Sequence, residues 1–145
     1  MPRMLDLIRM VQRGELPPPP VAELIGFRLA AVEIGVAVLE LEAGPQHANP
    51  MGTLHGGIFC DIADAAMGMA WGSTLGEGET FTTLELKINY LKPVWTGKLV
   101  ATGRVVNAGR TIGLIECDVV DASDRLVARA TSTVMTLRGE QAVGR

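Results

Sequence analysis

The chain has 145 residues, of which 48% are hydrophobic and 20% are charged. This length and composition fit one folded domain and exclude a disordered, collagen-like or coiled-coil chain. Thirteen basic and 16 acidic side chains give a net charge of −3, so the chain lacks the basic field typical of nucleic-acid-binding proteins. The high apolar content suggests subunit contacts beyond the core of one monomer.

The cysteines and the first residues bear on compartment. Cys60 and Cys117 are the only cysteines and form no CxxC pair, which argues against a disulfide scaffold and against a cysteine-rich zinc site. Charged residues within 1–13 leave no uninterrupted apolar segment of the kind that a signal peptide contains. No apolar run is long enough for a membrane span. We therefore expect a cytoplasmic protein with no metal site and no membrane span.

The N-terminal part predicts short helices followed by a strand pair. Apolar residues at helical spacing predict an amphipathic helix that ends at Gly14. Four prolines predict an extended linker. The expected elements are a helix over 2–13, a linker over 17–20, a helical turn over 20–26, and strands over 27–33 and 36–42 joined at Gly35.

The middle of the chain predicts a polar loop over 44–57 that leads into a buried helix over 57–75. One stripe of this helix carries the polar and small residues, and the opposite stripe is expected to face a sheet. The first stripe holds Gly57, Cys60, Asp61, Asp64, Gly68 and Trp71, and the second holds Ile58, Ile62, Ala65, Ala66 and Met69.

The remaining sequence predicts four strands, over 81–90, 98–106, 112–120 and 126–137, with turns at 107–110 and 121–124. In the first of them, alternation places Thr82, Leu84, Leu86, Ile88 and Tyr90 on one face and Thr83, Glu85, Lys87 and Asn89 on the other. Two strands, a helix and four strands predict an α+β fold in which one helix packs on an antiparallel sheet.

The loop and the start of the central helix carry the candidate chemistry. The first N–H groups of a helix lack internal partners, and glycines at 56 and 57 would let a carbonyl oxygen approach them as in an oxyanion hole. Asp64 is a carboxylate within an apolar helix, which is costly unless it is partnered or used. Structural roles remain open for Asp61, as a partner of the helix dipole, and for His55, as a loop hydrogen-bonding group. His47 is compatible with a plain surface position.

Three stretches together resemble a known family. They are His47-Ala-Asn49-Pro-Met-Gly52-Thr-Leu-His55-Gly56-Gly57 followed by Asp64, then Thr83-Leu-Glu-Leu-Lys-Ile-Asn89-Tyr90-Leu-Lys92-Pro93, and the turn Asn107-Ala-Gly109-Arg110-Thr111. The pattern resembles hotdog-fold acyl-CoA thioesterases of the phenylacetate-pathway (PaaI) and 4-hydroxybenzoyl-CoA thioesterase group. The resemblance covers about residues 21–138.

The resemblance implies a role for each matched residue. Asp64 would be the nucleophile or the general base, and the Gly56 N–H, with Gly57 beside it, would polarise the thioester carbonyl. Asn49 would place the carbonyl or the water, His55 would orient the loop, and Thr83 would lie close to the water. Coenzyme A would contact Tyr90, Lys92, Pro93, Trp95, Ala108, Gly109, Arg110 and Thr111.

The resemblance also implies a long central helix wrapped by an antiparallel β-sheet, and a homodimer or homotetramer with active sites at the dimer interface. The domains would be a helix and linker over 1–20, the hotdog domain over 21–138 and a tail over 139–145. The expected activity is hydrolysis of a hydrophobic or aromatic acyl-CoA, with no cofactor because coenzyme A is part of the substrate, and no nucleic-acid partner.

Two other functions remain open. A hotdog hydroxyacyl-thioester dehydratase would use a histidine and an acid, and His47 and Asp61 have a compatible spacing, although the flanking Pro-Gly and Phe-Pro pairs of such enzymes are missing. A non-catalytic acyl-CoA-binding module would need no acid beside the thioester. The acyl group itself is not readable, since Ile58, Phe59, Met67, Met69 and Trp71 could line an aryl or an aliphatic pocket.

Overall fold

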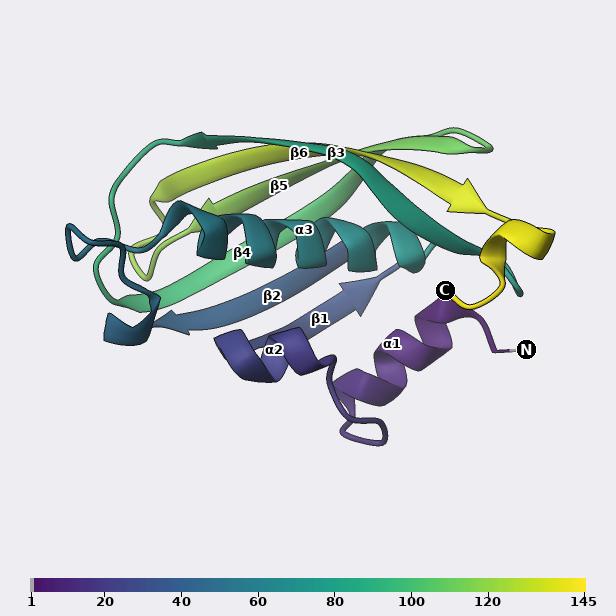
Figure 1. Cartoon of the computed structure of the whole chain (residues 1–145), viewed down its shortest axis with the longest axis horizontal. Coiled ribbons are helices and arrows are strands. Elements are labelled where there is room, and N and C mark those ends of the chain that lie inside the picture. Colours follow the sequence, from purple (N-terminus) through teal and green to yellow (C-terminus); the bar gives the residue numbers. More distant parts are fainter. Residues whose placement is uncertain (1) are drawn as a thin grey trace.

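The computed structural model describes residues 2–145 and has one long helix packed on a six-stranded antiparallel sheet (Figure 1). The predicted order of elements is confirmed, with small shifts of their ends. The helices are α1 (Met4–Gln12), α2 (Pro20–Ile25) and α3 (Gly56–Gly72), with 3₁₀ turns η1 (Pro45–His47) and η2 (Gly139–Ala142). The strands are β1 (Phe27–Glu33), β2 (Val36–Ala43), β3 (Thr80–Tyr90), β4 (Gly97–Ala108), β5 (Ile112–Val120) and β6 (Leu126–Leu137).

The sheet curves around α3 and leaves two edge strands. Its order is β1-β2-β4-β5-β6-β3, so β1 and β3 each have one unpaired edge. The strand that follows α3 in sequence thus lies at the far side of the sheet from β1 and β2. Within residues 2–145, no helix is both long and apolar enough to cross a bilayer.

Only some of the residues predicted on the buried face of α3 are buried in the structure. Ile62 and Ala66 are buried as predicted, but Ile58, Ala65 and Met69 are half-buried rather than packed on the sheet. Trp71, expected on the polar stripe, is buried, and its indole N–H donates to Thr136 Oγ1 at 3.2 Å. The prediction was wrong there because α3 is apolar nearly all round, so the sequence gives its orientation only weakly. The buried side chains of α3 are Phe59, Ile62, Ala63, Ala66, Met67, Ala70 and Trp71.

Strand β3 contains a β-bulge that the alternation pattern did not predict. Thr83 pairs with Val134 and Glu85 pairs with Thr133, which leaves Leu84 as the extra residue. A bulge reverses which alternate residues face the core. As a result Phe81, before the bulge, and Leu86, after it, both pack against the core. The predicted face of Thr83 was therefore wrong, and Thr83 lies on the side of α3.

The bulge is fixed by a buried hydroxyl from the neighbouring strand. Ser132, which is 1% exposed, donates to the carbonyl of Glu85 at 3.0 Å. A carbonyl displaced from the regular ladder would otherwise lack a partner. Ser132 therefore stabilises the local backbone that turns Thr83 toward the helix.

The N-terminal segment packs under α3 and β1 (Figure 1). Leu5 of α1 is 4% exposed and belongs to the hydrophobic core. A Cβ built on Gly72 would lie 2.5 Å from Met4 Sδ, so α1 contacts the C-terminal end of α3 closely. Pro20 is the first residue of α2, as the predicted helical turn over 20–26 has it, so the linker ends before it; proline suits the first turn of a helix.

A glycine allows α3 to approach the centre of the sheet. A Cβ on Gly103 of β4 would lie 2.5 Å from the backbone oxygen of Ala66 and 2.8 Å from the amide nitrogen of Met67. Backbone atoms in a helix cannot move aside as a flexible side chain can. Glycine at this position therefore sets the distance between α3 and the sheet.

We predict that Gly103→Ala lowers the free energy of unfolding by about 1–3 kcal/mol, the usual cost of overpacking a core. Urea denaturation followed by circular dichroism measures this. Gly76→Ala is the matched control, because a Cβ there would meet only the Glu79 carboxylate, at 3.4 Å. Equal stability of the two variants would contradict a close helix–sheet contact at Gly103.

Candidate active site

The N-terminus of α3 leaves one backbone donor free. His55 is the N-cap, and its Nδ1 accepts a hydrogen bond from the N–H of Gly57 at 2.8 Å. Within residues 2–145, no group accepts from the N–H of Gly56. The two glycine amides, which the sequence treated as a pair, therefore differ: Gly57 is capped by His55, whereas Gly56 is available to a ligand oxygen.

Asn49 shapes the loop that precedes α3. Its side-chain Oδ1 accepts from the N–H groups of Met51 and Thr53 at 2.9 and 3.2 Å, and its Nδ2 donates to Thr53 Oγ1 at 2.8 Å. These bonds use the acceptor oxygen and one of two amide hydrogens. Asn49 also lines a hollow of about 350 Å³ beside Gly56, so its second amide hydrogen is the group that remains for a substrate or water.

Tyr90 closes the other side of this hollow. Its hydroxyl donates to the carbonyl of Gly56 at 2.9 Å and lies 3.4 Å from Cys60 Sγ. Its ring meets that of Phe59 edge-on, with centroids 5.7 Å apart. Burial and the Cys60 thiol raise the pKa of Tyr90 to about 12, so the phenol stays a donor at neutral pH. Tyr90 therefore holds the first turn of α3, a contact that the sequence did not predict.

Asp64 lies on the open side of α3, next to Thr83. The carboxylate is exposed, and Thr83 Oγ1 donates to Asp64 Oδ1 at 3.2 Å. Both residues line a hollow of about 260 Å³ between α3, β3 and the N-terminal segment. The rest of this wall is mostly apolar and includes Gly68, which was predicted on the same stripe as Asp64, together with residues that the sequence did not single out for the site: Met4, Ile8, Pro19, Val21, Phe27 and Phe81. The apolar stripe of the N-terminal helix was the available signal for Met4 and Ile8.

Asp61 lies one turn before Asp64 and feels its charge. The pKa of Asp61 is raised, first by burial and then by the negative charge of Asp64, while His55 acts in the opposite direction. Two acids on one helix face at this spacing repel each other when both are ionised. The Asp61 carboxylate therefore makes the folded protein less stable once it loses its proton.

The free amide and the carboxylate do not meet within one protomer. Gly56 and Asp64 are eight residues apart on α3, which corresponds to about 12 Å along the axis. They line different hollows, one at the helix start and one near its middle. Within one protomer, the free amide and the carboxylate therefore belong to separate hollows.

The residues expected to hold coenzyme A form two separate groups. Tyr90, Lys92 and Pro93 line the hollow beside Gly56. The next residue, Val94, is tied to the loop before α3, because its carbonyl accepts from the N–H of Leu54 at 2.7 Å. The turn that follows β4 lies at the opposite end of the sheet, because β4 has 12 residues and spans about 40 Å. There, Arg138 donates to the Arg110 carbonyl at 2.7 Å. The residues at that end are Ala108, Gly109, Arg110 and Thr111, all exposed.

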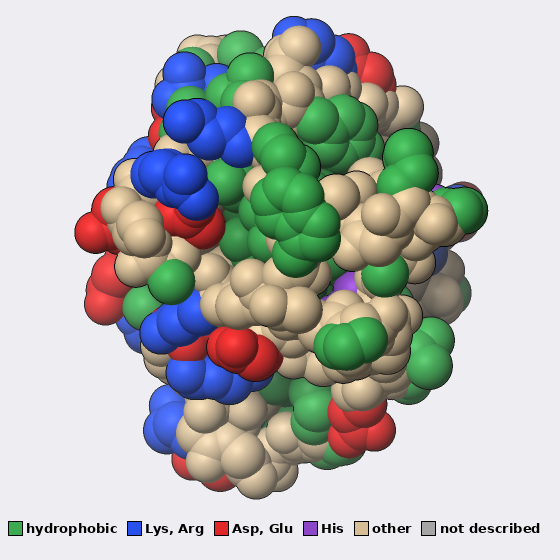
Figure 2. Space-filling model, turned by 90° about the vertical axis from the view of Figure 1, so that its left-hand side faces the viewer, with side chains coloured by type: hydrophobic (Ala, Val, Ile, Leu, Met, Phe, Trp, Pro, Cys, Tyr) green, Lys and Arg blue, Asp and Glu red, His purple; other side chains and the backbone are tan. Residues whose placement is uncertain are grey.

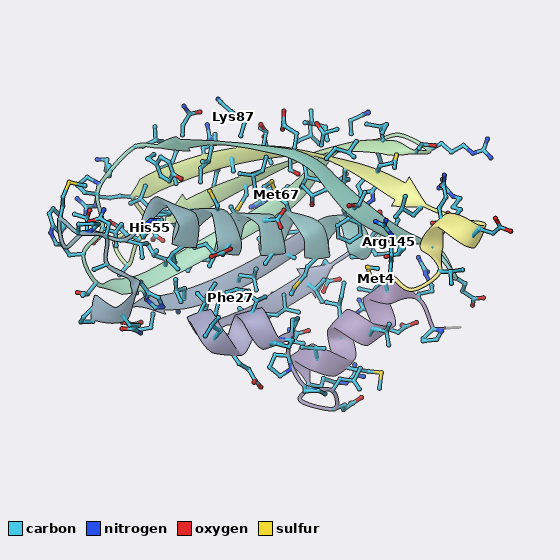
Figure 3. All side chains as sticks on the ribbon, viewed as in Figure 1. Met4, Phe27, His55, Met67, Lys87 and Arg145 are labelled. Atoms are coloured by element: carbon cyan, nitrogen blue, oxygen red, sulfur yellow. The ribbon has the colours of Figure 1, made fainter. Side chains whose placement is uncertain are left out.

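The end of the molecule where α3 begins combines apolar and basic side chains. Figure 2 shows hydrophobic side chains at the centre of this face and Lys and Arg side chains along one flank. The exposed hydrophobic residues of these loops are Met51, Leu91 and Trp95. Figure 3 places His55 at this same end, beside the first turn of α3. Trp95 does not line the hollow beside Gly56 but lies in the loop that bounds it.

His47 is buried rather than on the surface. It is 5% exposed, its Nδ1 accepts from the N–H of Gly44 at 3.1 Å, and its Nε2 lies 2.7 Å from the carbonyl of Ile25. An acceptor Nδ1 requires the Nε2–H tautomer, which donates to Ile25. The Nε2 atom of His47 thus connects the loop to α2 and Nδ1 holds the loop itself at Gly44, so neither nitrogen is free to act as a base.

Comparisons with known proteins agree with this arrangement. The family model described as the Thioesterase superfamily matches residues 51–128. A protein of Saccharolobus solfataricus named as an esterase is 31% identical over 80% of this chain and 82% of its own. The 1,4-dihydroxy-2-naphthoyl-CoA hydrolase of Listeria monocytogenes is 28% identical over 77% of this chain and 91% of its own. A thioesterase structure from Ralstonia eutropha, titled as related to phenylacetic acid degradation, is 30% identical over 88% and 98% of the two chains, with a TM-score of 0.81.

The family match covers more than half of the chain, and the sheet and central helix agree with it. The chain therefore belongs to the thioesterase superfamily and has the hotdog fold. At the level of the family, it is a thioester hydrolase. Residues 2–50, which contribute Met4, Ile8 and Phe27 to the hollow beside Asp64, lie outside the matched range.

We predict that Asp61→Asn makes the protein more stable at pH 7 and leaves its stability unchanged near pH 3. Below the pKa values of both states, Asp61 is protonated folded or unfolded and contributes nothing. As the pH rises, the unfolded chain loses the proton first, because the folded-state pKa is raised. The loss of folding free energy that comes from ionising Asp61 in the folded state is therefore complete at neutral pH, and asparagine removes it. Urea denaturation at both pH values measures the difference, and a gain of equal size at pH 3 would contradict this origin.

Proposed function

We propose that this protein hydrolyses acyl-CoA thioesters of hydrophobic acids, with Asp64 as nucleophile or general base and the Gly56 amide as oxyanion donor. The observation that carries the proposal is the Asp64 carboxylate, exposed beside a mostly apolar hollow and hydrogen-bonded by Thr83. A carboxylate in this position has no structural ion pair within residues 2–145. A catalytic use accounts for an exposed carboxylate that has no ion pair and lies beside an apolar hollow.

The Gly56 amide would supply electrostatic stabilisation. A thioester oxygen that enters the hollow beside Gly56 would meet an N–H already oriented by the helix and held by the Tyr90–Gly56 bond. His55 would act as a positioning residue, because it occupies the neighbouring Gly57 amide. Asn49 would keep the loop open and could donate its second amide hydrogen to the carbonyl or to water.

Two routes are compatible with this arrangement. As a general base, Asp64 would take a proton from water while the water oxygen adds to the thioester carbon, and the C–S bond would break to give the acid and coenzyme A. As a nucleophile, the Asp64 carboxylate would attack the thioester carbon, break the C–S bond and expel the coenzyme A thiolate, which leaves a mixed anhydride that water then hydrolyses to the acid and the free carboxylate. Thr83 would orient the carboxylate in both. No cofactor is needed beyond the coenzyme A of the substrate itself.

The separation of Gly56 from Asp64 supports a site built from two chains. One protomer holds them about 12 Å apart along α3, whereas a carbonyl under attack must lie within about 3 Å of both donor and nucleophile. In a two-fold dimer, the Gly56 end of one α3 can face Asp64 of the other. Strand β3 has an unpaired edge at which two sheets could join. We therefore propose a homodimer, alone or within a homotetramer. In it, coenzyme A contacts the residues beside Gly56 from one chain and the turn over 108–111 from the other.

The alternative functions fit less well. A dehydratase would need a histidine base, and His47 uses both ring nitrogens in structural bonds. A non-catalytic binding module would not require the exposed carboxylate of Asp64. Hydrolysis by an Asp64 variant distinguishes this module from an enzyme.

We predict that Asp64→Asn lowers kcat for acyl-CoA hydrolysis by about 10²–10⁴ fold, the range for loss of a positioned acid or base. Release of thiol, trapped by a dye, measures hydrolysis, and calorimetric titration measures binding of coenzyme A esters. Binding is expected to persist, because asparagine has nearly the same volume. Asp61→Asn is the matched control on the same helix face and should retain activity. Unchanged hydrolysis by Asp64→Asn would remove Asp64 from the mechanism.

We predict that Gly56→Pro lowers kcat by about 10²–10³ fold, because it deletes the proposed oxyanion donor at a helix position that tolerates proline. Gly56→Ala is the control, since it adds the same Cβ against the Tyr90 hydroxyl but keeps the N–H. Mixing Gly56→Pro with Asp64→Asn, after unfolding and refolding together, should restore part of the activity in heterodimers. Absence of recovery in verified heterodimers would contradict a shared site.

A further inference from the structure

A third hollow, larger than the two beside Gly56 and Asp64, lies between β1 and the N-terminal segment. Its volume is about 730 Å³, within the range of small-molecule sites. Leu16, Pro18, Phe27, Leu29, Leu39 and Met69 contribute apolar walls. It is formed by the linker and the first strand, together with Met69 of α3, and lies in the layer beneath α3 in Figure 1.

This hollow shares part of its wall with the one beside Asp64. Pro19, Phe27 and Met69 line both. Figure 3 shows Phe27 and Met4 on the side of α3 that faces the N-terminal helices. A group attached to a carbonyl at Asp64 would therefore lie next to Phe27 and Met69, which also border the larger space.

The outer wall is firmly attached to the rest of the molecule. Gln12 Nε2 donates to the Ala30 carbonyl at 3.0 Å, and Arg3 Nε donates to the Leu75 carbonyl at 3.3 Å. The consecutive prolines 17–20 have no N–H groups and a fixed φ. They can face an apolar ligand without leaving a backbone donor unpaired, and they lose little entropy when it binds.

The charged side chains at this hollow are not buried in it. Glu15, Glu23 and Arg28 are exposed. Arg13 binds Glu15 with Nε–Oε1 at 2.6 Å, and Glu40 binds Arg28. The interior is therefore left to aliphatic and aromatic side chains, which suits an uncharged apolar occupant.

We propose that this space is an acyl-chain chamber whose occupant is the tail of an unbranched aliphatic acyl-CoA. The N-terminal segment, which forms its outer wall, then determines which chain lengths the protein prefers. The inference rests on the proposed function, and specifies its substrate. An aryl acid would fill only the space beside Asp64, whereas a chain of eight or more carbons continues past Met69 and gains from the larger space. Phe59, Met67 and Trp71, the other candidates for an acyl pocket, are 3% exposed or less and pack in the core.

Non-hydrolysable thioethers test the chamber independently of catalysis. Butyl-CoA and decyl-CoA bind without reaction, and calorimetric titration gives the dissociation constant of each. Since each buried methylene favours binding by about fourfold, decyl-CoA should bind the wild-type protein at least tenfold more tightly than butyl-CoA. Leu16→Trp, which fills the chamber, should abolish this difference and leave butyl-CoA binding unchanged. Leu24→Trp is the matched control, because Leu24 is 85% exposed on α2 and lines neither hollow.

Leu16→Ala gives a second variant that introduces no bulk, and it should reduce the decyl preference by a few fold. Equal binding of both thioethers by the wild-type protein, or weakening of both to the same extent by Leu16→Trp, would overturn the proposal. A change of oligomeric state in Leu16→Trp, measured by light scattering, would instead mark this face as a contact between copies and would also overturn it. If the protein binds decyl-CoA more tightly than butyl-CoA but hydrolyses no thioester, the chamber is supported and the proposed function is rejected.

Discussion

The contact between α3 and the centre of the sheet controls the rest of this structure. Gly103 lets the helix backbone approach β4 closely, and the helix is apolar enough to be buried on most of its circumference. A helix buried in this way presents only its first turn and one narrow stripe to ligands. Those two places carry the free Gly56 amide and the Asp64 carboxylate. The position of the candidate chemistry is thus a consequence of how the core is packed.

Each of the two groups is held by a neighbour from another part of the chain. Tyr90, at the end of β3, binds the carbonyl of Gly56, and Thr83 of the same strand binds Asp64. Both can face α3 only because the bulge at Leu84 changes the alternation between them. Ser132 in turn fixes that bulge. One irregularity in an edge strand therefore positions both ends of the candidate site.

The N-terminal segment gives this chain a feature beyond the region that matches the thioesterase superfamily. Helix α1 contributes Leu5 to the core and places Met4 and Ile8 beside the hollow of Asp64. The proline run then borders the larger space next to it. Residues before the matched range thus form part of the hollow beside Asp64, while the candidate catalytic groups lie on α3.

The sequence by itself determined the order of elements and most of their limits, and it supplied the candidate site residues, because these depend on local patterns: alternation in the strands, prolines and glycines at the ends, and a short polar motif before an apolar helix. Only the tertiary structure decided how those residues face one another. The bulge that turns Thr83, the burial of His47 and Trp71, and the contact between Tyr90 and Gly56 all depend on partners between 19 and 65 residues away. The distance between Gly56 and Asp64, about 12 Å along the axis, is fixed by the helix itself, because eight residues of α3 separate the two groups.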